Sequence, residues 1–484
     1  MACTTILIGK NASYDGSTIM ARNDDSPSGV FTSKKLVKVE KNKNGKKYCS
    51  VISKVEVDLP EESLSYTCMP TVEEGEGIWG ACGINELNVA MTATETITTN
   101  ARVLGADPLV VYDKKKNIKG GIGEEDLVSL VLPYIHSARE GVLHLGSLLE
   151  RYGTYESNGI GFSDENEIWW LESIGGHHWI ARRVKDDEYV VMPNQFGIDQ
   201  FDFNDAFGKK ENYLCSEDLK EFIQENFLSL DIENNFSPRL AFGSHDDSDH
   251  VYNTPRAWYM LSYFNPKSFL KGGVNEEKTP MSDDLPYSMV PERKITLEEV
   301  KYILSSHYQG TEYDCYSRFN DSCIKGAYRP IGISRTSFMA ILQIRPYVLD
   351  QLKGVEWLSF GSNVFNCSCP FYTSATLVPD YYGNTTTTVS TDNLYWQSRL
   401  LGALADSHFG TCEIFIERYQ NAVASASHQL LKAYDEKIEK GLATLEEANQ
   451  AIANMVKEET DKALSKVLYT ASCQMKNGYS RSDN

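Results

Sequence analysis

The chain has 484 residues, of which 41% are hydrophobic and 11% aromatic. This composition permits a large buried core and excludes a disordered chain, because disordered segments are poor in aromatic residues. Its 47 Lys and Arg against 67 Asp and Glu give a net charge of −20. Such a surface repels nucleic acids and anionic membranes, so we expect neither as a partner.

The chain begins MACTTILIGK, without a basic stretch followed by a long apolar one, and it contains no run of about 18 apolar residues. We therefore expect a cytoplasmic protein. The 11 cysteines have no repeating spacing, and most are expected to be free in a reducing compartment. Cys367 and Cys369 form a CxC pair with no second pair nearby, so we expect no zinc and no cofactor.

The first 25 residues predict a β-hairpin. Residues 4–9 are β-branched and apolar, residues 11–16 are turn formers ending in Asp-Gly, and residues 17–23 form a second strand. The hairpin would return Arg22 and the residues after it to the side of Cys3.

Strand-like segments continue to about residue 100, and residues 124–152 show the apolar spacing of two helices interrupted at Pro133. Further strands are predicted at 167–172, 178–184 and 189–193 and in a β region at about 325–390. Further helices are predicted at 216–227, 297–306, about 393–440 and 444–467. Residues 271–294 are rich in Gly, Pro and charge and predict a surface loop. The mixture indicates an α+β fold with helices packed outside large sheets.

Cys3 is a candidate N-terminal nucleophile. That chemistry requires that the preceding residues be removed, that the new α-amine act as base, and that nearby positive charge favour the thiolate. Ala2 is small enough to permit removal of Met1, and the Cys3 thiol could then release Ala2. An α-amine with an ordinary pKa of about 7.7–8.0 suits a general base, and Arg22 would supply the positive charge. From these residues alone, an ordinary cysteine is the competing interpretation.

Longer segments resemble a known family. The chain is similar to the bacterial dipeptidase A family in MACTTILIGKNASYDGSTIMARNDD, in WGACGINELNVAMTATETI, in NGIGFSDENEIWWLESIGGHHWIARRVKDDEYVVMPNQF and in HVYNTPRAWYML. These cysteine peptidases belong to the N-terminal-nucleophile hydrolases, with penicillin V acylase and bile salt hydrolase. The resemblance implies a four-layer αββα sandwich of mainly antiparallel sheets. We expect one domain over residues 1–484, with a helical extension at 393–484 packed on it.

The resemblance also implies site residues. Cys3 matches the nucleophile, Arg22 matches the arginine near its sulfur, and Asp25 matches the group that orients the free α-amine. Asn194, in VVMPNQF, matches a side chain of the oxyanion hole, and Arg256, in NTPRAWY, matches the second arginine.

The second oxyanion donor of the acylases would fall near residues 95–96, where this sequence departs from them, and it stays unassigned. The expected activity is hydrolysis of dipeptides through an acyl-enzyme on Cys3, without a metal, in a homo-oligomer.

Several alternatives stay open. Arg22 and Asp25 could form a surface ion pair, Asn194 could be a turn residue, and Arg256 could be a charge on a helix surface. Arg256 could also bind a substrate carboxylate, with the acidic loop SHDDSDH at residues 244–250 holding the substrate ammonium; that loop could instead bind a metal or be solvated. At the level of function, the rivals are a non-peptide amidase and a non-catalytic protein similar to the secernins.

Overall fold

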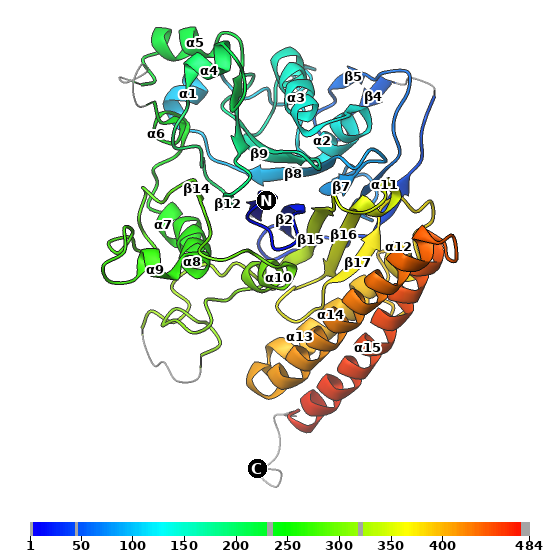
Figure 1. Ribbon diagram of the computed structural model, residues 1–484. Helices are drawn as coiled ribbons and strands as arrows, with labels where there is room; N and C mark the ends of the chain where they lie inside the picture. Colours follow the sequence, from blue (N-terminus) through cyan, green and yellow to red (C-terminus); the bar gives the residue numbers. More distant parts are fainter. Residues whose placement is uncertain (1–2, 44–46, 230–235, 318–322, 476–484) are drawn as a thin grey trace.

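The computed structural model describes residues 3–43, 47–229, 236–317 and 323–475, without the side chains of residues 93–95. Met1 and Ala2, whose removal is predicted, lie outside these ranges. Within them, antiparallel sheets and helices form the α+β fold that the sequence predicts (Figure 1).

The larger sheet has seven strands in the order β14-β12-β1-β2-β15-β16-β17, and the paired neighbours are antiparallel. Its strands are β1 (Thr4–Ile8), β2 (Thr18–Asp25), β12 (Tyr189–Met192), β14 (Ser288–Met289), β15 (Thr336–Ile344), β16 (Gly354–Phe360) and β17 (Cys369–Tyr372). The predicted hairpin is confirmed, and β1 and β2 lie side by side near the middle of this sheet.

The smaller sheet has six strands in the order β13-β11-β10-β9-β8-β7. Its strands are β7 (Cys82–Ile84), β8 (Ala90–Thr96), β9 (Asn158–Ser163), β10 (Ile168–Ser173), β11 (Trp179–Val184) and β13 (Tyr213–Cys215). Two short antiparallel pairs complete the strands: β3 (Val37–Val39) with β6 (Tyr66–Cys68), and β4 (Lys47–Cys49) with β5 (Glu56–Asp58).

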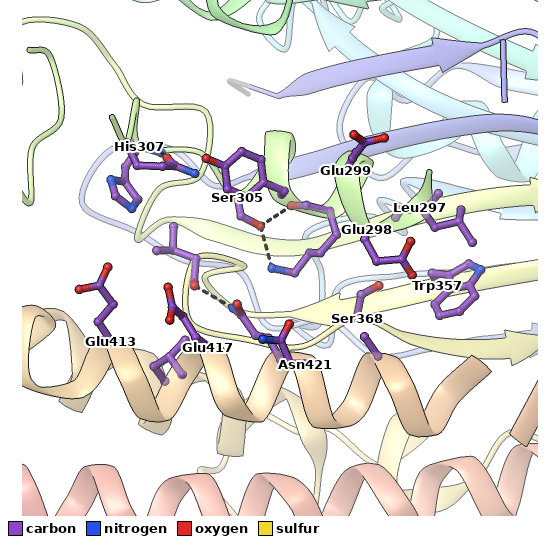
Figure 2. A pocket seen from close by; sticks show the side chains of 18 of the residues that line it. Leu297, Glu298, Glu299, Ser305, His307, Trp357, Ser368, Glu413, Glu417 and Asn421 are labelled. Atoms are coloured by element: carbon purple, nitrogen blue, oxygen red, sulfur yellow. Dashed lines mark hydrogen bonds between the residues drawn. The ribbon is translucent and has the colours of Figure 1, made fainter. Parts of the chain in front are cut away.

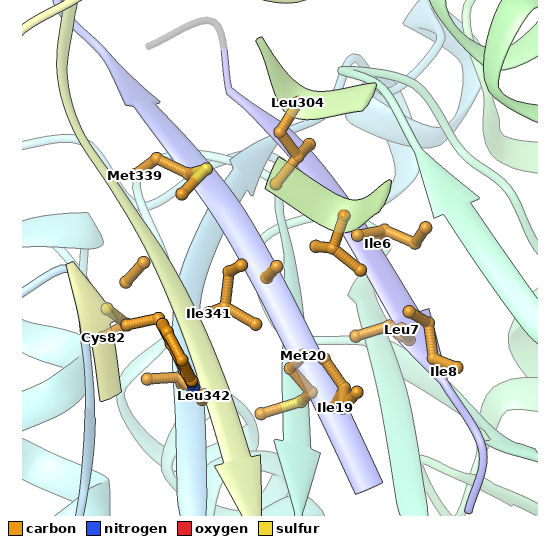
Figure 3. Close-up of a cluster of buried hydrophobic side chains, with 14 of the residues drawn as sticks. Ile6, Leu7, Ile8, Ile19, Met20, Cys82, Leu304, Met339, Ile341 and Leu342 are labelled. Atoms are coloured by element: carbon orange, nitrogen blue, oxygen red, sulfur yellow. The ribbon is translucent and has the colours of Figure 1, made fainter. Parts of the chain in front are cut away.

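The two sheets pack face to face, with β2 against β8 and β9, and with β7 against β15 and β16. The central strands of the larger sheet are buried along their whole length. Figure 3 shows their apolar side chains packed together, among them Ile6, Leu7, Ile8, Ile19, Met20, Met339, Ile341 and Leu342. Each such side chain stabilises the fold by about 1.5–3 kcal/mol, so the strands that carry the site are held rigidly.

Helices cover the sheets on their outer sides (Figure 1). The helices α2 (Glu124–Val131) and α3 (Ala138–Tyr152) pack on the smaller sheet. The larger sheet is covered by α10 (Leu297–Leu304), α13 (Leu394–Asp406), α14 (Phe409–Glu439) and α15 (Leu445–Cys473). None of the helices in the described ranges combines the length and the apolar character needed to cross a bilayer.

Shorter helices connect these parts. They are α1 (Ala101–Ala106), α4 (Phe203–Phe207), α5 (Leu219–Glu225), α6 (Pro238–Phe242), α7 (Asp249–Tyr252), α8 (Thr254–Phe264), α9 (Pro266–Phe269), α11 (Asp350–Lys353) and α12 (Asp380–Gly383). A short 3-10 helix at Leu132–Tyr134 separates α2 from α3, which confirms the interruption predicted at Pro133.

One predicted helix is wrong. The segment 393–440 forms α13 and α14 rather than a single helix, because the chain turns at Ser407 and His408. Asp, Ser and His are weak helix formers, and the turn lets α13 pack on β16 while α14 packs on β17 and α15. The last helix, predicted to end at 467, continues to Cys473.

Candidate active site

The antiparallel register of the hairpin determines what surrounds Cys3, the residue immediately before β1. Thr5 of β1 pairs with Arg22 of β2. Because the strands run in opposite directions, continuing this register by two residues places Cys3 opposite Asp24. Successive side chains alternate between the faces of a sheet, so Cys3, Arg22 and Asp24 share the face that looks toward the smaller sheet.

Arg22 lies directly against the sulfur. Its Nη2 donates to Cys3 Sγ at 3.0 Å, and its Nη1 donates to the carbonyl oxygen of Ala81 at 3.0 Å. Both Cys3 and Arg22 are buried. Burial opposes the arginine charge, but Cys3, Asp24 and Glu124 raise the pKa of Arg22 above its usual range, and it stays protonated. A fixed positive charge at this distance favours the thiolate form of Cys3.

Two carboxylates and a lysine complete this side of the site, and the sequence did not single them out. Asp24 Oδ1 lies 3.4 Å from Arg22 Nη2, and Asp24 Oδ2 lies 3.2 Å from Lys34 Nζ. Although burial opposes ionisation, Lys34 and Arg22 lower the pKa of Asp24. A carboxylate oxygen of Glu124, the first residue of α2, lies 3.8 Å from Arg22 Nη2.

Cys3, Asp24 and Glu124 place one potential metal-ligand atom each within 4.8 Å of one another. The same three groups surround Arg22 Nη2, at 3.0 Å for the sulfur and at 3.4 and 3.8 Å for the two carboxylates. The guanidinium therefore occupies the position that an ion would need. A metal could bind there only by displacing a buried cation, so these residues do not fit a metal site.

Arg256 approaches Cys3 from the other direction, from the first turn of α8. Each of the five N–H groups of an arginine has an acceptor here. The contacts are Nη1 to Cys3 O at 2.5 Å and Thr4 Oγ1 at 2.6 Å, Nη2 to Asn194 Oδ1 at 2.8 Å and Asn253 Oδ1 at 2.6 Å, and Nε to Tyr252 O at 2.7 Å. Arg256 is buried, so the helix-surface alternative is wrong. Because its donors are directed at the protein, the geometry favours a role in positioning the site over binding of a substrate carboxylate.

Asn194 lies opposite Cys3 on the second neighbour of β1. Thr5 pairs with Met192 of β12, and continuing this register by two residues brings Asn194 beside Cys3. Asn194 is buried. An arginine can only donate, so the contact with Arg256 fixes Oδ1 on that side and turns the NH₂ group of Asn194 away from it.

The Asn194 amide reaches the smaller sheet. Its Nδ2 donates to the carbonyl oxygen of Thr96, the last residue of β8, at 3.0 Å. The contact also places Asn194 against the segment 95–96, in which the resemblance locates the second oxyanion donor.

Asp25 does not pair with Arg22, and the predicted alternative of a surface ion pair is wrong. Alternation along β2 turns Asp25 to the face opposite Arg22 and Asp24. There its buried carboxylate accepts hydrogen bonds from Arg329 Nη2 and, at 2.6 Å, from Thr336 Oγ1. A role in orienting the α-amine of Cys3 stays a prediction.

Positive charge gathers near Asp25 around the half-buried ring of Tyr252. The guanidinium carbons of Arg329 and Arg256 lie 5.1 and 5.6 Å from the ring centre, and Arg335 Nη2 donates to Tyr252 Oη at 3.2 Å. Burial opposes the effect, but Arg329 and Arg335 lower the pKa of Tyr252. Three arginine side chains therefore lie around Tyr252, on the side from which Arg256 approaches Cys3.

The acidic loop at 244–250 does not converge on one point. Asp249 accepts hydrogen bonds from Asn253 Nδ2 and, at 2.9 Å, from Ser244 Oγ. His250 Nε2 lies 2.8 Å from Asp283, whereas His245 Nε2 lies 3.3 Å from a backbone carbonyl. The loop reaches the site through Asp249, which holds Asn253 and thereby Arg256.

A cavity of about 580 Å³ lies elsewhere, between α10 and α14 (Figure 2). It is lined in part by Ile341 of β15, which pairs with Ala21, whereas Arg22 pairs with Ala340. Paired residues share a face and neighbours alternate, so this cavity lies on the other side of the larger sheet from Cys3. None of the five predicted site residues lines it.

Comparisons with known proteins show the family of the chain. Residues 2–422 match the model of peptidase family C69. The chain is 49% identical to a dipeptidase of Bifidobacterium longum and 51% identical to a probable dipeptidase A of Streptococcus pyogenes, in both cases over 100% of each chain. It is 44% identical to dipeptidase A of Lactobacillus helveticus, over 93% of this chain and 91% of that protein. The chain belongs to peptidase family C69.

Proposed function

We propose that this protein is a cysteine dipeptidase whose nucleophile is Cys3, exposed as a new N-terminus after removal of Met1 and Ala2. The observation that carries the proposal is the 3.0 Å contact between Arg22 Nη2 and Cys3 Sγ. A buried guanidinium against a buried thiol favours the thiolate, which is the nucleophilic form of cysteine. Dipeptides are the proposed substrates because the three relatives carry the name dipeptidase.

The residues at the site suggest the following reaction. The Cys3 thiolate attacks the scissile carbonyl carbon, and the developing oxyanion accepts hydrogen bonds from the Asn194 amide and from a backbone N–H. The α-ammonium of Cys3 gives its proton to the leaving amine as the C–N bond breaks, which leaves an acyl-enzyme. The neutral α-amine then takes a proton from water, which attacks the thioester and releases the free acid and the thiolate.

The proposal includes a place for the remaining predicted residues. Arg256 holds the Cys3 carbonyl and the Asn194 amide in position, and Asp25 orients the α-amine. It also includes the four-layer N-terminal-nucleophile sandwich, because two facing antiparallel sheets carry helices on their outer sides. That fold presents the start of a central strand as the reactive end, which is where Cys3 lies.

Comparing Cys3→Ser with Cys412→Ser tests the proposal, because Cys412 is another buried thiol, on α14. A panel of dipeptides is assayed with both variants and wild type, and intact masses are recorded. We expect wild type to begin at Cys3 and to show a transient mass increase of one aminoacyl group. Cys3→Ser should lose at least about 10³-fold in kcat/KM, while Cys412→Ser should match wild type.

Four outcomes would contradict the proposal. Full activity in a protein that retains Ala2 would exclude the free α-amine as base. An active Cys3→Ser variant would exclude the thiol. Turnover of N-acyl amides without turnover of dipeptides would favour the amidase, and no turnover of either would favour a non-catalytic protein.

A further inference from the structure

The loop that follows β12 carries Asn194 and is tied to the smaller sheet a few residues later. Gly197 and Ile198 of this loop are buried. Both of their N–H groups donate to Glu172 Oε1, at 2.7 Å from Gly197 and at 3.3 Å from Ile198. Because Glu172 belongs to β10, its carboxylate connects a loop of the larger sheet to the smaller sheet.

Arg239 of α6 holds the carbonyl groups of the same two residues. Its Nη2 donates to the carbonyl oxygen of Gly197 at 2.6 Å, and its backbone N–H donates to that of Ile198 at 3.0 Å. Its Nη1 donates to the carbonyl oxygen of Leu285 at 2.6 Å. The N–H and C=O groups of both loop residues are therefore held by Glu172 and Arg239, three and four positions after Asn194.

A carboxylate in the position of Glu172 is costly for the fold. Glu172 is fully buried, and burial raises its pKa to about 7, although the hydrogen bonds from the loop and from Trp170 Nε1 and the charge of Arg239 oppose this effect. Among the described residues, its second oxygen, Oε2, has no hydrogen-bond partner. Burial of an incompletely hydrogen-bonded carboxylate is unfavourable. What this side chain contributes is a fixed acceptor for two N–H groups of the loop.

We propose that Glu172 and Arg239 are positioning residues, which hold the loop so that the Asn194 amide meets the oxyanion. This inference rests on the proposed function, in which Asn194 is an oxyanion donor, and it adds two residues that act through Asn194. The side chain of Asn194 is held separately by Thr96 at 3.0 Å and by Arg256 at 2.8 Å. Misplacing a catalytic group by about 1 Å can lower a rate by about 10²-fold, so the backbone anchor matters as well.

The test measures kcat and KM for a dipeptide with wild type, Glu172→Ala and Glu172→Gln. Glutamine keeps an acceptor oxygen for the two N–H groups, whereas alanine removes it. We expect Glu172→Ala to lower kcat by about 10–10²-fold and to change KM by less than about twofold. Glu172→Gln should stay within about threefold of wild type in kcat. Once Asn194 is alanine, Glu172→Ala should have little further effect, because the two residues act as a unit.

Glu356→Ala is the matched control. Glu356 is a second fully buried carboxylate whose pKa burial raises to about 7, but it lies on β16 and accepts from Cys82 Sγ at 3.7 Å. Its kcat should stay within about threefold of wild type. Melting temperatures show which variants are folded. If Glu172→Ala is not, Arg239→Lys replaces it, because lysine cannot contact Gly197 and Leu285 together, and its kcat should fall by about 3–10-fold.

Several results would overturn the inference. Equal losses in Glu172→Ala and Glu172→Gln would show that the acceptor oxygen is not what matters, and an equal loss in Glu356→Ala would show a general effect of removing a buried carboxylate. Losses that add fully to that of Asn194→Ala would place the effect elsewhere. An unchanged kcat in folded Glu172→Ala would leave the cysteine mechanism intact, whereas an unchanged kcat in Asn194→Ala would also remove the proposed oxyanion donor.

Discussion

Cys3, the proposed nucleophile, and Cys367, to which we assign no catalytic role, are both buried thiols. Each sulfur accepts a hydrogen bond at 3.0 Å, Cys3 from Arg22 and Cys367 from Tyr419 Oη. Hydrogen bonds from Cys369 and Tyr419, with the charge of Lys301, lower the pKa of Cys367 against the effect of burial. Burial and a nearby cation are therefore common to the two sites.

The kind of cation and the surrounding groups are different. Arg22 stays protonated at any pH the protein meets, whereas burial lowers the pKa of Lys301 to about 8. Arg256 also donates a hydrogen bond to the carbonyl oxygen of Cys3 and another to the side chain of Asn194, at the start of β1. Cys367 lies close to β17 and next to Ser368, which lines the cavity of Figure 2. No amide comparable to Asn194 is among the contacts described for Cys367. We expect reactivity where a permanent cation lies next to an amide that can stabilise an oxyanion, as proposed for Arg22 and Asn194.

The largest effect is expected when the cation beside each thiol is replaced. In Arg22→Met the thiolate loses its hydrogen bond, and Asp24 and Glu124 lose a counter-charge, so kcat/KM should fall by about 10³-fold. The pH at which iodoacetamide half-maximally alkylates Cys3 should rise by about one unit or more. Arg22→Lys keeps the charge but cannot contact Cys3 and Ala81 together, so its loss should be about 10²-fold.

Lys301→Met is the matched control, since it removes the cation that faces Cys367. Its kcat/KM should stay within about twofold of wild type. An alkylation profile that Arg22→Met leaves unchanged, or a large loss in Lys301→Met, would show that the two thiols are not separated by their cations. Because Arg22→Met leaves buried carboxylates less compensated, its melting temperature is measured first, and Arg22→Lys serves if the methionine variant unfolds.

The next largest effect should come from Asn194, the proposed oxyanion donor, since no comparable amide is among the contacts described for Cys367. Asn194→Ala should lower kcat by about 10²–10³-fold with a smaller change in KM. Arg256→Lys should lower kcat by about 10-fold, because lysine cannot make the five contacts that fix Asn194 and the Cys3 carbonyl.

Combining the two substitutions tests whether Arg256 acts by positioning the amide. If it does, Arg256→Lys should have little further effect once Asn194 is alanine, since the two residues act as a unit. Fully additive losses in the double variant would instead indicate that Arg256 contributes to the reaction independently of Asn194.

Much of this site follows from the sequence through the hairpin. A turn at Asp15–Gly16 between two apolar segments determines that Arg22 returns beside Cys3, and that prediction is confirmed. Strand alternation also contains a signal that the resemblance obscured: Asp24, not Asp25, shares the face of Arg22. The two-residue alternation of side chains along a strand was enough to predict that Asp24 lies beside Arg22.

Other parts of the site could not come from local pattern. Glu124 begins a helix about 100 residues after the hairpin, and it meets Arg22 because the two sheets pack face to face. Nothing in the spacing of Lys34 or Asn253 indicates that they contact Asp24 and Arg256. The break between α13 and α14 had a weak local signal, but the packing of α14 on β17 and α15 decides it.

The smallest expected effect concerns the free energy of unfolding, and it tests whether Lys301, unlike Arg22, loses its charge within an accessible pH range. An unfolded chain keeps the ordinary lysine pKa of 10.5, whereas in the folded protein burial lowers the pKa of Lys301 to about 8. Between these values the unfolded chain binds more protons, so this residue's contribution to the free energy of unfolding rises with pH. Below pH 8 the buried charge is present and its cost is complete. The advantage of Lys301→Met over wild type should therefore be largest near pH 7 and shrink by about 1–3 kcal/mol toward pH 10.5.

Urea unfolding of both proteins at several pH values between 7 and 10.5 measures this difference, in a Cys367→Ser background so that the neighbouring thiol does not titrate. Lys301 Nζ donates to Ser305 Oγ at 2.8 Å and to Asn363 O at 2.7 Å. Losing these contacts changes stability by an amount that does not depend on pH in this range, so only the slope of the difference reports the charge. A flat difference would mean that Lys301 has the same pKa in the folded and the unfolded chain and stays charged at neutral pH. A charged residue would then lie beside both thiols at neutral pH, and the proposed oxyanion donor Asn194 would be the remaining difference between them.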